Sequence, residues 1–373
     1  MYDTIIIGGG ASGLLSACEL KGKNLLLESK DRVGKKILVT GNGRCNLSNS
    51  NLTGEEYSDP QFFRAVQEKY SSNLLDFWKE KGLFLREGGA GRVYPFSNQA
   101  STVLDVLRFG ARKAEIKTNC IVKSVKKDKG GYAVLTSDGE YYSKRVMLTC
   151  GGGNLEIAKS LNLRLTDTYP ALCALKTDTN KLKGLDGVRA HAKVSLEIDG
   201  KVEYVESGEV LFRKYGVSGI AVFNASLKYA RALRDKKCKR AILTLDLLDG
   251  LEDKEVETVL STRIKRGDDN LLTGIISNKI GQAVLDDFTN AQEIVKNLRS
   301  IKLNVLGLLD DNAQITVGGV RLDEVKPSLE SKTYDGLYLC GEVLDQDGLC
   351  GGYNLHWAFL SALVASQDIN QKI

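Results

Sequence analysis

Residues 3–28, DTIIIGGGASGLLSACELKGKNLLLE, decide the fold of this chain. An apolar strand expected at Thr4–Ile7 leads into the spacing Gly8-x-Gly10-x-x-Gly13. A short helix follows, and then a second apolar strand at Leu25–Leu27 that ends on Glu28. Strand, glycine turn, helix and strand in this order predict one complete βαβ unit.

The spacing of the three glycines has a physical meaning. Gly8 allows a tight turn, Gly10 lets a pyrophosphate approach the backbone, and Gly13 lets the helix pack closely on the strand. The first helical turn, with Ala11 and Ser12, offers N–H groups and a positive dipole end to phosphates. Glu28 stands where a carboxylate accepts hydrogen bonds from ribose hydroxyls. The turn therefore predicts a dinucleotide site rather than an incidental glycine turn.

Length and composition set the class of protein. A chain of 373 residues, 42% apolar and 27% charged, has the size and balance of one large or two moderate globular domains. No apolar run reaches the roughly 20 residues that span a bilayer, and Asp3 before Ile5–Ile7 argues for a core strand rather than a signal peptide. We therefore expect no membrane partner.

Cysteine and histidine usage points in the same direction. The eight cysteines show no C-x-x-C or zinc spacing, and the only histidines are His191 and His356. This favours a reduced cytoplasmic protein with no metal site. The net charge of +5 permits an anionic partner without requiring one.

The pattern along the chain predicts an α/β domain interrupted by an insert. Residues 61–82 and 100–113 have helical spacing, and Gly34–Asn51 is expected to be an ordered loop that cradles a ligand. Short β runs over 115–149 end in Cys150-Gly151-Gly152-Gly153. We expect residues 1–168 and 311–373 to form the nucleotide domain. Residues 169–310 form the predicted insert, β-rich and barrel-like over 169–250 and helical over 251–310.

A second signature lies near the other end of the chain. Residues 336–365 read GLYLCGEVLDQDGLCGGYNLHWAFLSALVA, with a strand expected at Leu337–Leu339 and Gly341-Glu342 just after it, beyond Cys340. Gly351-Gly352 then opens a final helix. A carboxylate after a strand can hold polyol hydroxyls, and a helix N-terminus can stabilise negative charge at the pyrimidine end of a reduced flavin.

Five blocks in order carry a resemblance that covers nearly the whole chain: IIIGGGASGL, GKKILVTGNGRCNLSN, EVLFRKYGVSGIAVFNAS, ITVGGV and LCGEVLDQDGLCGGYNLHWAF. They resemble the bacterial BaiN/YhiN-like flavoproteins, some of which carry an aminoacetone-oxidase description. The resemblance implies a discontinuous, glutathione-reductase-like Rossmann domain that binds FAD non-covalently, with an inserted β-barrel plus helical domain on the substrate side. It implies FAD contacts at Gly8, Gly10, Ala11, Ser12, Gly13, Glu28, Lys36, Gly43, Arg44, Cys45, Asn46, the backbone of Val122, Gly341, Glu342, Gly351, Gly352, Tyr353, Asn354 and Leu355.

The chain departs from this family's pattern at three places. Relatives often carry Thr-His at Arg213-Lys214, Pro at Ile220 and Gln at His356. The first two fall in the insert, and the third lies next to the flavin helix.

Three side chains are candidates for catalysis. Tyr353 could donate a proton to a substrate carbon or carbonyl, although its backbone alone could be what matters. His356, at the start of a helix, is expected to stay neutral, in either a catalytic or a packing role. Arg44 could hold a substrate oxygen, a phosphate or its own loop. Cys45 has no C-x-x-C partner, which favours packing over redox chemistry.

The resemblance leaves several acceptors open. They are an activated, enone-like C=C reduced by NAD(P)H through the flavin, uridine in ribosomal RNA reduced to dihydrouridine, and a small amine or aminoketone that is oxidised. A flavin-dependent redox sensor or RNA-binding module is the non-enzymatic alternative. The basic run Lys228–Arg240 could contact RNA phosphates or could be a solvated helix end. Only one GxGxxG is present, because Gly151–Gly153 lacks the third spaced glycine, so we expect no separate NAD(P)H-binding unit. The oligomeric state is left open.

Overall fold

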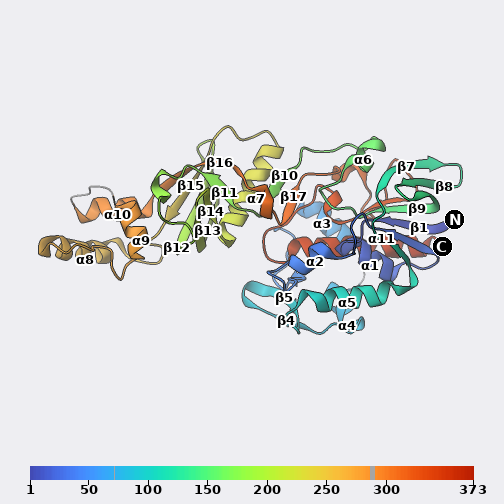
Figure 1. Cartoon of the computed structure of the whole chain (residues 1–373), viewed down its shortest axis with the longest axis horizontal. Coiled ribbons are helices and arrows are strands. Elements are labelled where there is room, and N and C mark those ends of the chain that lie inside the picture. The colour runs from blue at the N-terminus through green and yellow to red at the C-terminus, as the bar shows by residue number, and fades with distance from the viewer. Residues whose placement is uncertain (71, 286–289) are drawn as a thin grey trace. The chain divides into compact units, whose positions relative to one another are not determined.

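The computed structural model describes residues 1–70, 72–285 and 290–373 (Figure 1). It divides into two compact units, one formed by Met1–Thr168 with Ile315–Ile373 and the other by Tyr169–Gln314. The first unit is therefore assembled from two separate stretches of the chain.

A seven-stranded sheet forms the centre of the first unit, in the order β6-β2-β1-β9-β8-β7, with β18 also paired to β9. The strands are β1 (Tyr2–Ile7), β2 (Asn24–Leu27), β6 (Glu115–Lys117), β7 (Val122–Asp128), β8 (Gly131–Thr136), β9 (Gly139–Leu148) and β18 (Leu337–Leu339). Pairs among β6, β2, β1, β9 and β18 are parallel, whereas β7, β8 and β9 form an antiparallel meander. The expected βαβ unit and the expected short β runs over 115–149 are confirmed.

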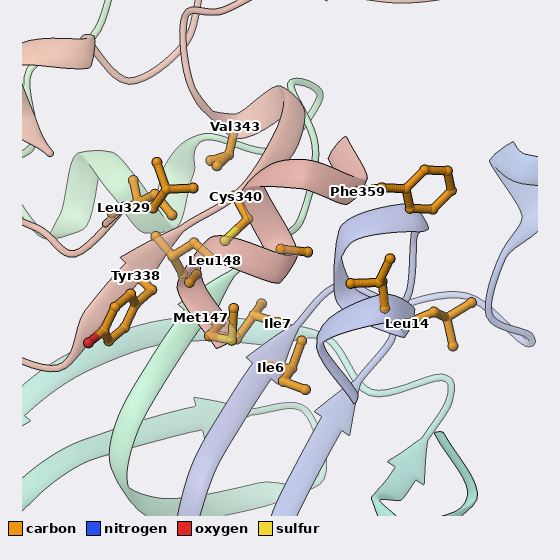
Figure 2. Packing of buried hydrophobic residues seen from close by; sticks show 14 of the residues in the cluster. Ile6, Ile7, Leu14, Met147, Leu148, Leu329, Tyr338, Cys340, Val343 and Phe359 are labelled. Atoms are coloured by element: carbon orange, nitrogen blue, oxygen red, sulfur yellow. The ribbon is translucent and has the colours of Figure 1, made fainter. Parts of the chain in front are cut away.

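Two helices, α1 (Ala11–Glu19) and α11 (Tyr353–Gln371), pack against each other in this unit. Figure 2 shows part of the apolar cluster that they share with the sheet, including Ile6, Leu14 and Phe359. Strand side chains on both faces of β1 are buried because helices and loops cover the sheet on both sides. This packing holds the starts of α1 and α11 in fixed places.

Smaller elements complete the first unit. They are α2 (Lys35–Val39), α3 (Pro60–Gln67), α4 (Leu74–Glu80), α5 (Ala100–Gly110), α6 (Glu156–Ser160), β17 (Ile315–Val317) and a three-stranded sheet of β3 (Ser48–Asn49), β5 (Arg92–Pro95) and β4 (Leu85–Glu87). The expected single helix over 61–82 is wrong, because α3 and α4 are separate. Asp59 caps α3, and Asn73 caps α4 by accepting from Leu75 N. Ser71 lies outside the described residues.

A cluster of charged groups ties the end of α11 to the sheet unit. The Glu330 carboxylate accepts hydrogen bonds from Lys326 Nζ (2.9 Å), Lys372 Nζ (3.1 Å) and Gly336 N (3.0 Å). Burial opposes ionisation of this carboxyl group, but the three donors outweigh it and hold the Glu330 pKa at about 2.

The second unit contains a closed barrel with strand order β11-β14-β13-β12-β15-β16. Its strands are β11 (Leu175–Thr177), β12 (Arg189–Ile198), β13 (Lys201–Arg213), β14 (Gly216–Ser218), β15 (Ala241–Asp246) and β16 (Ile301–Leu308). Every second residue of β12 from Ala192 to Ile198 is buried, as the period of a half-buried strand requires.

Four helices accompany the barrel among the described residues of this unit: α7 (Ile220–Arg234), α8 (Asp253–Arg266), α9 (Asn278–Val284) and α10 (Ala291–Arg299). The prediction of a helical stretch over 251–310 is wrong at its end, because β16 pairs with β15 and β11 and closes the barrel. Alternating burial of Ile301 and Leu303 explains why this segment is a strand. Residues 286–289 of that stretch lie outside the described part of the chain.

Arg299, the last residue of α10, connects the barrel strand β15 to the start of α8 through ion pairs. Its guanidinium lies 3.1 Å from Asp246 Oδ2 and 2.7 Å from Asp253 Oδ1, and it donates to the Leu248 carbonyl at 2.7 Å. In the described residues, no helix combines the length and the apolar character that crossing a membrane requires.

Candidate functional site

The glycine turn after β1 has the three properties that the sequence predicted. Gly8 has φ +108°, and a Cβ there would lie 2.6 Å from the Thr149 carbonyl. A Cβ on Gly13 would lie 1.9 Å from the Gly8 carbonyl oxygen, so only glycine lets α1 pack this closely on β1. A Cβ on Gly10 would meet nothing within 4 Å. The space over Gly10 is therefore open to a ligand.

The start of α1 is prepared for an anion. Gly10 is the N-cap, no side chain caps the helix, and its first turn (Ala11, Ser12, Gly13) contains no acidic residue. The N–H groups and the positive dipole end of α1 are thus not neutralised by its own first turn.

Glu28 is held at the carboxyl edge of the sheet, directly after β2. Its Oε2 accepts from Gly9 N at 2.8 Å, and its Oε1 accepts from Lys30 N at 2.8 Å. Val122 is brought near it, because Cys120 N donates to the Glu28 carbonyl two residues earlier. Glu28 is part-exposed and Val122 is buried, so the backbone of Val122 is the group that it can offer.

The C-terminal signature meets the first turn at Gly341. This glycine has φ +72°, and a Cβ there would lie 2.3 Å from Ser12 Oγ. Its carbonyl accepts from Trp357 Nε1 at 3.2 Å, and its N–H donates to Ser361 Oγ at 2.9 Å. Two motifs more than 300 residues apart in the sequence thus form one site.

Glu342 is fixed from two sides. Its Oε1 accepts from Thr316 N in β17 at 2.7 Å, and its Oε2 lies 2.6 Å from Lys36 Nζ at the start of α2. The Lys36 side chain is 57% exposed and the Glu342 side chain 23% exposed. Both predicted contacts therefore face solvent at the same place.

The loop before β3 brings the remaining predicted residues to the start of α11. Gly43 and Cys45 both have positive φ, +79° and +57°. Asn46 is buried, and in the described residues its Oδ1 has no hydrogen-bond partner. A Cβ on Gly352 would lie 2.8 Å from this oxygen. Asn46 Oδ1 is thus an orphaned buried acceptor beside the helix start.

The start of α11 resembles that of α1. Gly352, with φ +102°, is its N-cap, no side chain caps it, and its first turn has no acidic residue. Asn354 uses its side chain to hold the preceding loop, accepting from Gly348 N and donating to the Gly348 carbonyl. Gly351, Tyr353 and part-buried Leu355 complete the turn. What this turn can offer a ligand is its backbone N–H groups.

The three candidate catalytic side chains differ in access. His356 is 6% exposed, its Nδ1 lies 2.8 Å from Ser48 Oγ, and burial lowers its pKa to about 4. Tyr353 is 9% exposed, and burial raises its pKa. Arg44 is exposed, with its guanidinium 4.9 Å from the centre of the Tyr94 ring. His356 is therefore a neutral core residue rather than an accessible acid.

Cys45 and Cys340 are buried packing residues. Burial raises the Cys45 pKa to about 12, which removes the thiolate needed for redox chemistry. Cys340 lies inside the apolar cluster near Leu148 and Val343, as Figure 2 shows. Among the described residues, no group of three or more His, Cys, Asp or Glu could hold a metal ion.

Sequence reasoning missed several residues of this region. Thr149 Oγ1 donates to the carbonyls of Ile7 and Gly8 and closes the first turn. Ser48 and Asn49 hold the start of α11, and Thr316 holds Glu342. The two β3 residues fall inside the loop expected to cradle a ligand, but residue type and spacing gave no signal for their partners.

These features fit FAD. The open space over Gly10 and the uncapped start of α1 suit a pyrophosphate, and the carboxylates of Glu28 and Glu342 suit ribose and ribityl hydroxyls. The uncapped start of α11 and the orphaned Asn46 oxygen suit the polar edge of an isoalloxazine ring. All of these groups belong to the first unit.

Comparison with known proteins identifies the family. The model for the HI0933-like protein Rossmann domain matches residues 2–368. The chain belongs to this family. A relative from Clostridium scindens named 3-dehydro-bile acid delta(4,6)-reductase is 34% identical, with 97% of each chain covered. A relative from Haemophilus influenzae named ribosomal RNA dihydrouridine synthase is 24% identical, with 99% of each chain covered.

A solved structure, quinol-fumarate reductase with menaquinol molecules, shares the fold with a TM-score of 0.50 and 13% identity, covering 99% of this chain and 71% of that chain. These findings confirm the resemblance, the Rossmann-type flavoprotein fold and the oxidoreductase class expected from the sequence.

Proposed function

We propose that this HI0933-like protein uses FAD to pass a hydride from NAD(P)H to a C=C bond conjugated to a carbonyl. The observation that carries the proposal is that the uncapped starts of α1 and α11 lie in one unit, where Gly341 contacts Ser12 of α1 and bonds to Trp357 and Ser361 of α11. Glu28 accepts from Gly9 beside the start of α1, and Glu342 directly follows Gly341. The relative at 34% identity, named as a reductase of a 3-dehydro-bile acid, supports a conjugated acceptor.

We assign the binding roles by chemistry. The N–H groups at Gly10–Gly13 hold the pyrophosphate, and Glu28 with the Val122 backbone holds the adenosine end. Glu342, oriented by Lys36, accepts from the ribityl hydroxyls. The backbone of Gly43–Cys45, the side chain of Asn46 and the backbone of Gly341 and Gly351–Leu355 hold the ring. When bound, FAD supplies the two-electron chemistry, and the protein supplies orientation and electrostatics.

Arg44 is the group we assign to the acceptor. Among the three candidate side chains it alone presents its charged head to solvent, while its stacking on Tyr94 restrains it. A guanidinium on the carbonyl oxygen draws electrons from the double bond, which favours hydride addition at the β-carbon and protonation at the α-carbon. Arg44→Met should lower kcat/KM for an enone about 100-fold, with Arg44→Lys less affected. An unchanged value would remove Arg44 from this role.

The reductant follows from an absence in the sequence. Since the chain has one GxGxxG with its paired acid, we propose that the nicotinamide and the acceptor use the same flavin face in turn. Stopped-flow reduction of the yellow protein by NADH and by NADPH, then reoxidation by oxygen, an enone or uridine-containing ribosomal RNA, tests this order. A crystal structure holding nicotinamide and acceptor analogue together would contradict it, and a colourless protein that takes up no FAD would overturn the whole proposal.

A second candidate is reduction of uridine in ribosomal RNA, which two specific observations favour. Relatives at 24% identity carry that name, and the run Lys228–Arg240 exposes Lys236, Lys237 and Lys239 after α7. If RNA is the acceptor, reversing these three charges to Glu should weaken salt-sensitive ribosomal RNA binding, whereas Lys254→Glu, on exposed α8, should not. Equal binding by both variants would count against RNA.

A further inference from the structure

The two-residue strand β3 lies against the start of α11 and is bonded to it through successive side chains. Ser48 Oγ lies 2.8 Å from His356 Nδ1, and the two residues are only 1% and 6% exposed. The His356 ring lies 6.1 Å from the Phe63 ring, measured between centroids. The pair is therefore enclosed by protein and cannot reach a substrate.

Asn49 holds the turn that precedes the helix. Its Nδ2 donates to the Gly351 carbonyl and to the Ala90 carbonyl, both at 3.0 Å, and its Oδ1 accepts from Asn51 N at 2.9 Å. The Asn49 side-chain amide thus uses its NH₂ group and its oxygen to connect the Gly351 turn with the backbone at Ala90 and Asn51. Asn49 is 5% exposed, so water does not compete for these bonds.

The backbone contact at the same place is very close. A Cβ on Gly352 would lie 2.3 Å from the Ser48 carbonyl oxygen, and Gly352 has φ +102°. On the other side of the turn, Tyr57 Oη donates to the Tyr353 carbonyl at 2.8 Å. The start of α11 is thus packed between β3 and Tyr57, and the residue at the closest contact, Gly352, has no side chain.

We propose that the Ser48–His356 pair is a positioning device that sets the direction in which the first N–H groups of α11 point at the flavin. The proposal rests on the proposed function, because it assumes FAD at this helix start. His356 is the fourth residue of α11, so a bond from its side chain to β3 restrains rotation of the helix start about its axis. The Gly351 bond from Asn49 fixes the turn but leaves that rotation free.

The effect is geometric rather than ionic. Burial lowers the His356 pKa to about 4, so the imidazole is neutral near pH 7 and adds no charge to the ring site. A neutral imidazole can hydrogen-bond to a hydroxyl group in either of its tautomers, because the ring nitrogen that faces the hydroxyl either donates to it or accepts from it. A glutamine amide has the same two capacities, which makes His356→Gln the conservative variant.

The test compares Ser48→Ala, His356→Leu, their double variant and His356→Gln with a matched control, Ser366→Ala. Ser366 is buried on the same helix, and in the described residues its hydroxyl makes no hydrogen bond. The readouts are the FAD dissociation constant from fluorescence, the flavin midpoint potential and the visible absorption spectrum of the holoprotein.

A lost neutral hydrogen bond should raise the FAD dissociation constant about fivefold in each single variant. The double variant should bind FAD no more weakly than the weaker-binding single variant, because the two single substitutions remove the same hydrogen bond. The potential should become more negative, since a misdirected helix start stabilises the reduced flavin less. His356→Gln should restore affinity and potential, and Ser366→Ala should match the wild type.

Three results would overturn the inference. One is a Ser48→Ala protein whose FAD affinity, potential and spectrum equal those of Ser366→Ala. Another is a loss of thermal stability with no change in potential or spectrum, which would make the pair merely structural. The third is additive effects in the double variant. In these cases the proposed function stands, whereas a wild-type protein without FAD would defeat that function first. If His356→Leu does not fold, Ser48→Ala still decides.

Discussion

Replacing Gly10 and Gly13 by alanine, one at a time, should separate cofactor binding from packing within a single turn. At Gly13 the new Cβ would lie 1.9 Å from the Gly8 carbonyl and 2.7 Å from Thr149 Oγ1, so α1 and β1 must part by about 1 Å. We expect this overpacking to cost about 3 kcal/mol of unfolding free energy. At Gly10, with nothing within 4 Å and φ −82°, the unliganded protein should change by about 0.5 kcal/mol or less.

For FAD binding we expect the larger effect at Gly10, whereas for stability we expect it at Gly13. A methyl group on Gly10 occupies the space that a pyrophosphate needs and displaces it from the N–H groups of α1. Losing charge-assisted hydrogen bonds worth about 3 kcal/mol in total corresponds to a roughly 100-fold weaker affinity for FAD. Gly10→Ala should therefore be a stable protein that binds FAD poorly.

Urea unfolding of the FAD-free protein and fluorescence titration with FAD measure the two quantities separately. Ala11→Gly, in the first turn of α1, is the control for a general loss of helix stability at the same place. The reasoning is refuted if Gly13→Ala unfolds at the wild-type urea concentration, because the closest contact in the turn would then cost nothing. It is equally refuted if Gly10→Ala binds FAD as tightly as the wild type.

Three further predictions concern stability and reactivity. The native Glu330 pKa is about 2, below its usual 4.5, so Glu330→Gln should lower the free energy of unfolding by about 1–2 kcal/mol at pH 7. The difference in unfolding free energy between the two proteins should vanish as pH falls from 4.5 toward 2. A constant difference across that pH range would contradict the prediction. Arg299→Met should remove the bonds to Asp246 and Asp253 and lower the thermal midpoint of the second unit by several degrees in calorimetry. Arg266→Met, at an exposed position, should not lower it. Equal midpoints for the two variants would show that the Arg299 bonds do not stabilise this unit. Cys45, buried and with a pKa raised to about 12, should resist iodoacetamide at pH 8 until the protein unfolds, and rapid labelling found by mass spectrometry would disprove its burial.

The first turn and the last strand could be predicted because local rules fix them. Gly8, Gly13 and Glu28 stand at separations that one βαβ geometry requires, and an apolar Leu337–Leu339 run before a glycine suits only a buried parallel strand. Strands β1 and β18 both pair in parallel with β9, so their carboxyl ends lie at one edge of the sheet.

Contacts made across long sequence distances were harder to predict. No periodicity announces that Ser48 bonds to His356, and a histidine at a helix start has no mark that distinguishes a core residue from an acid. The strand β16 was missed because its apolar alternation follows three helices and gains meaning only from the barrel edges that it joins. The start of α4 was missed because Asn73 begins that helix as its N-cap, and apolar spacing alone does not register a cap.

The split composition of the first unit has a consequence for how the chain folds during synthesis. The second unit is one uninterrupted stretch, Tyr169–Gln314, so all of its strands have been made before β18 and α11 emerge from the ribosome. The sheet around β9, in contrast, must wait with an open edge for Leu337–Leu339, and α1 must wait for its partner helix. Contacts of such long range close slowly and leave apolar surface exposed meanwhile. FAD added during translation should therefore shorten that exposed interval only after Gly352 has been made.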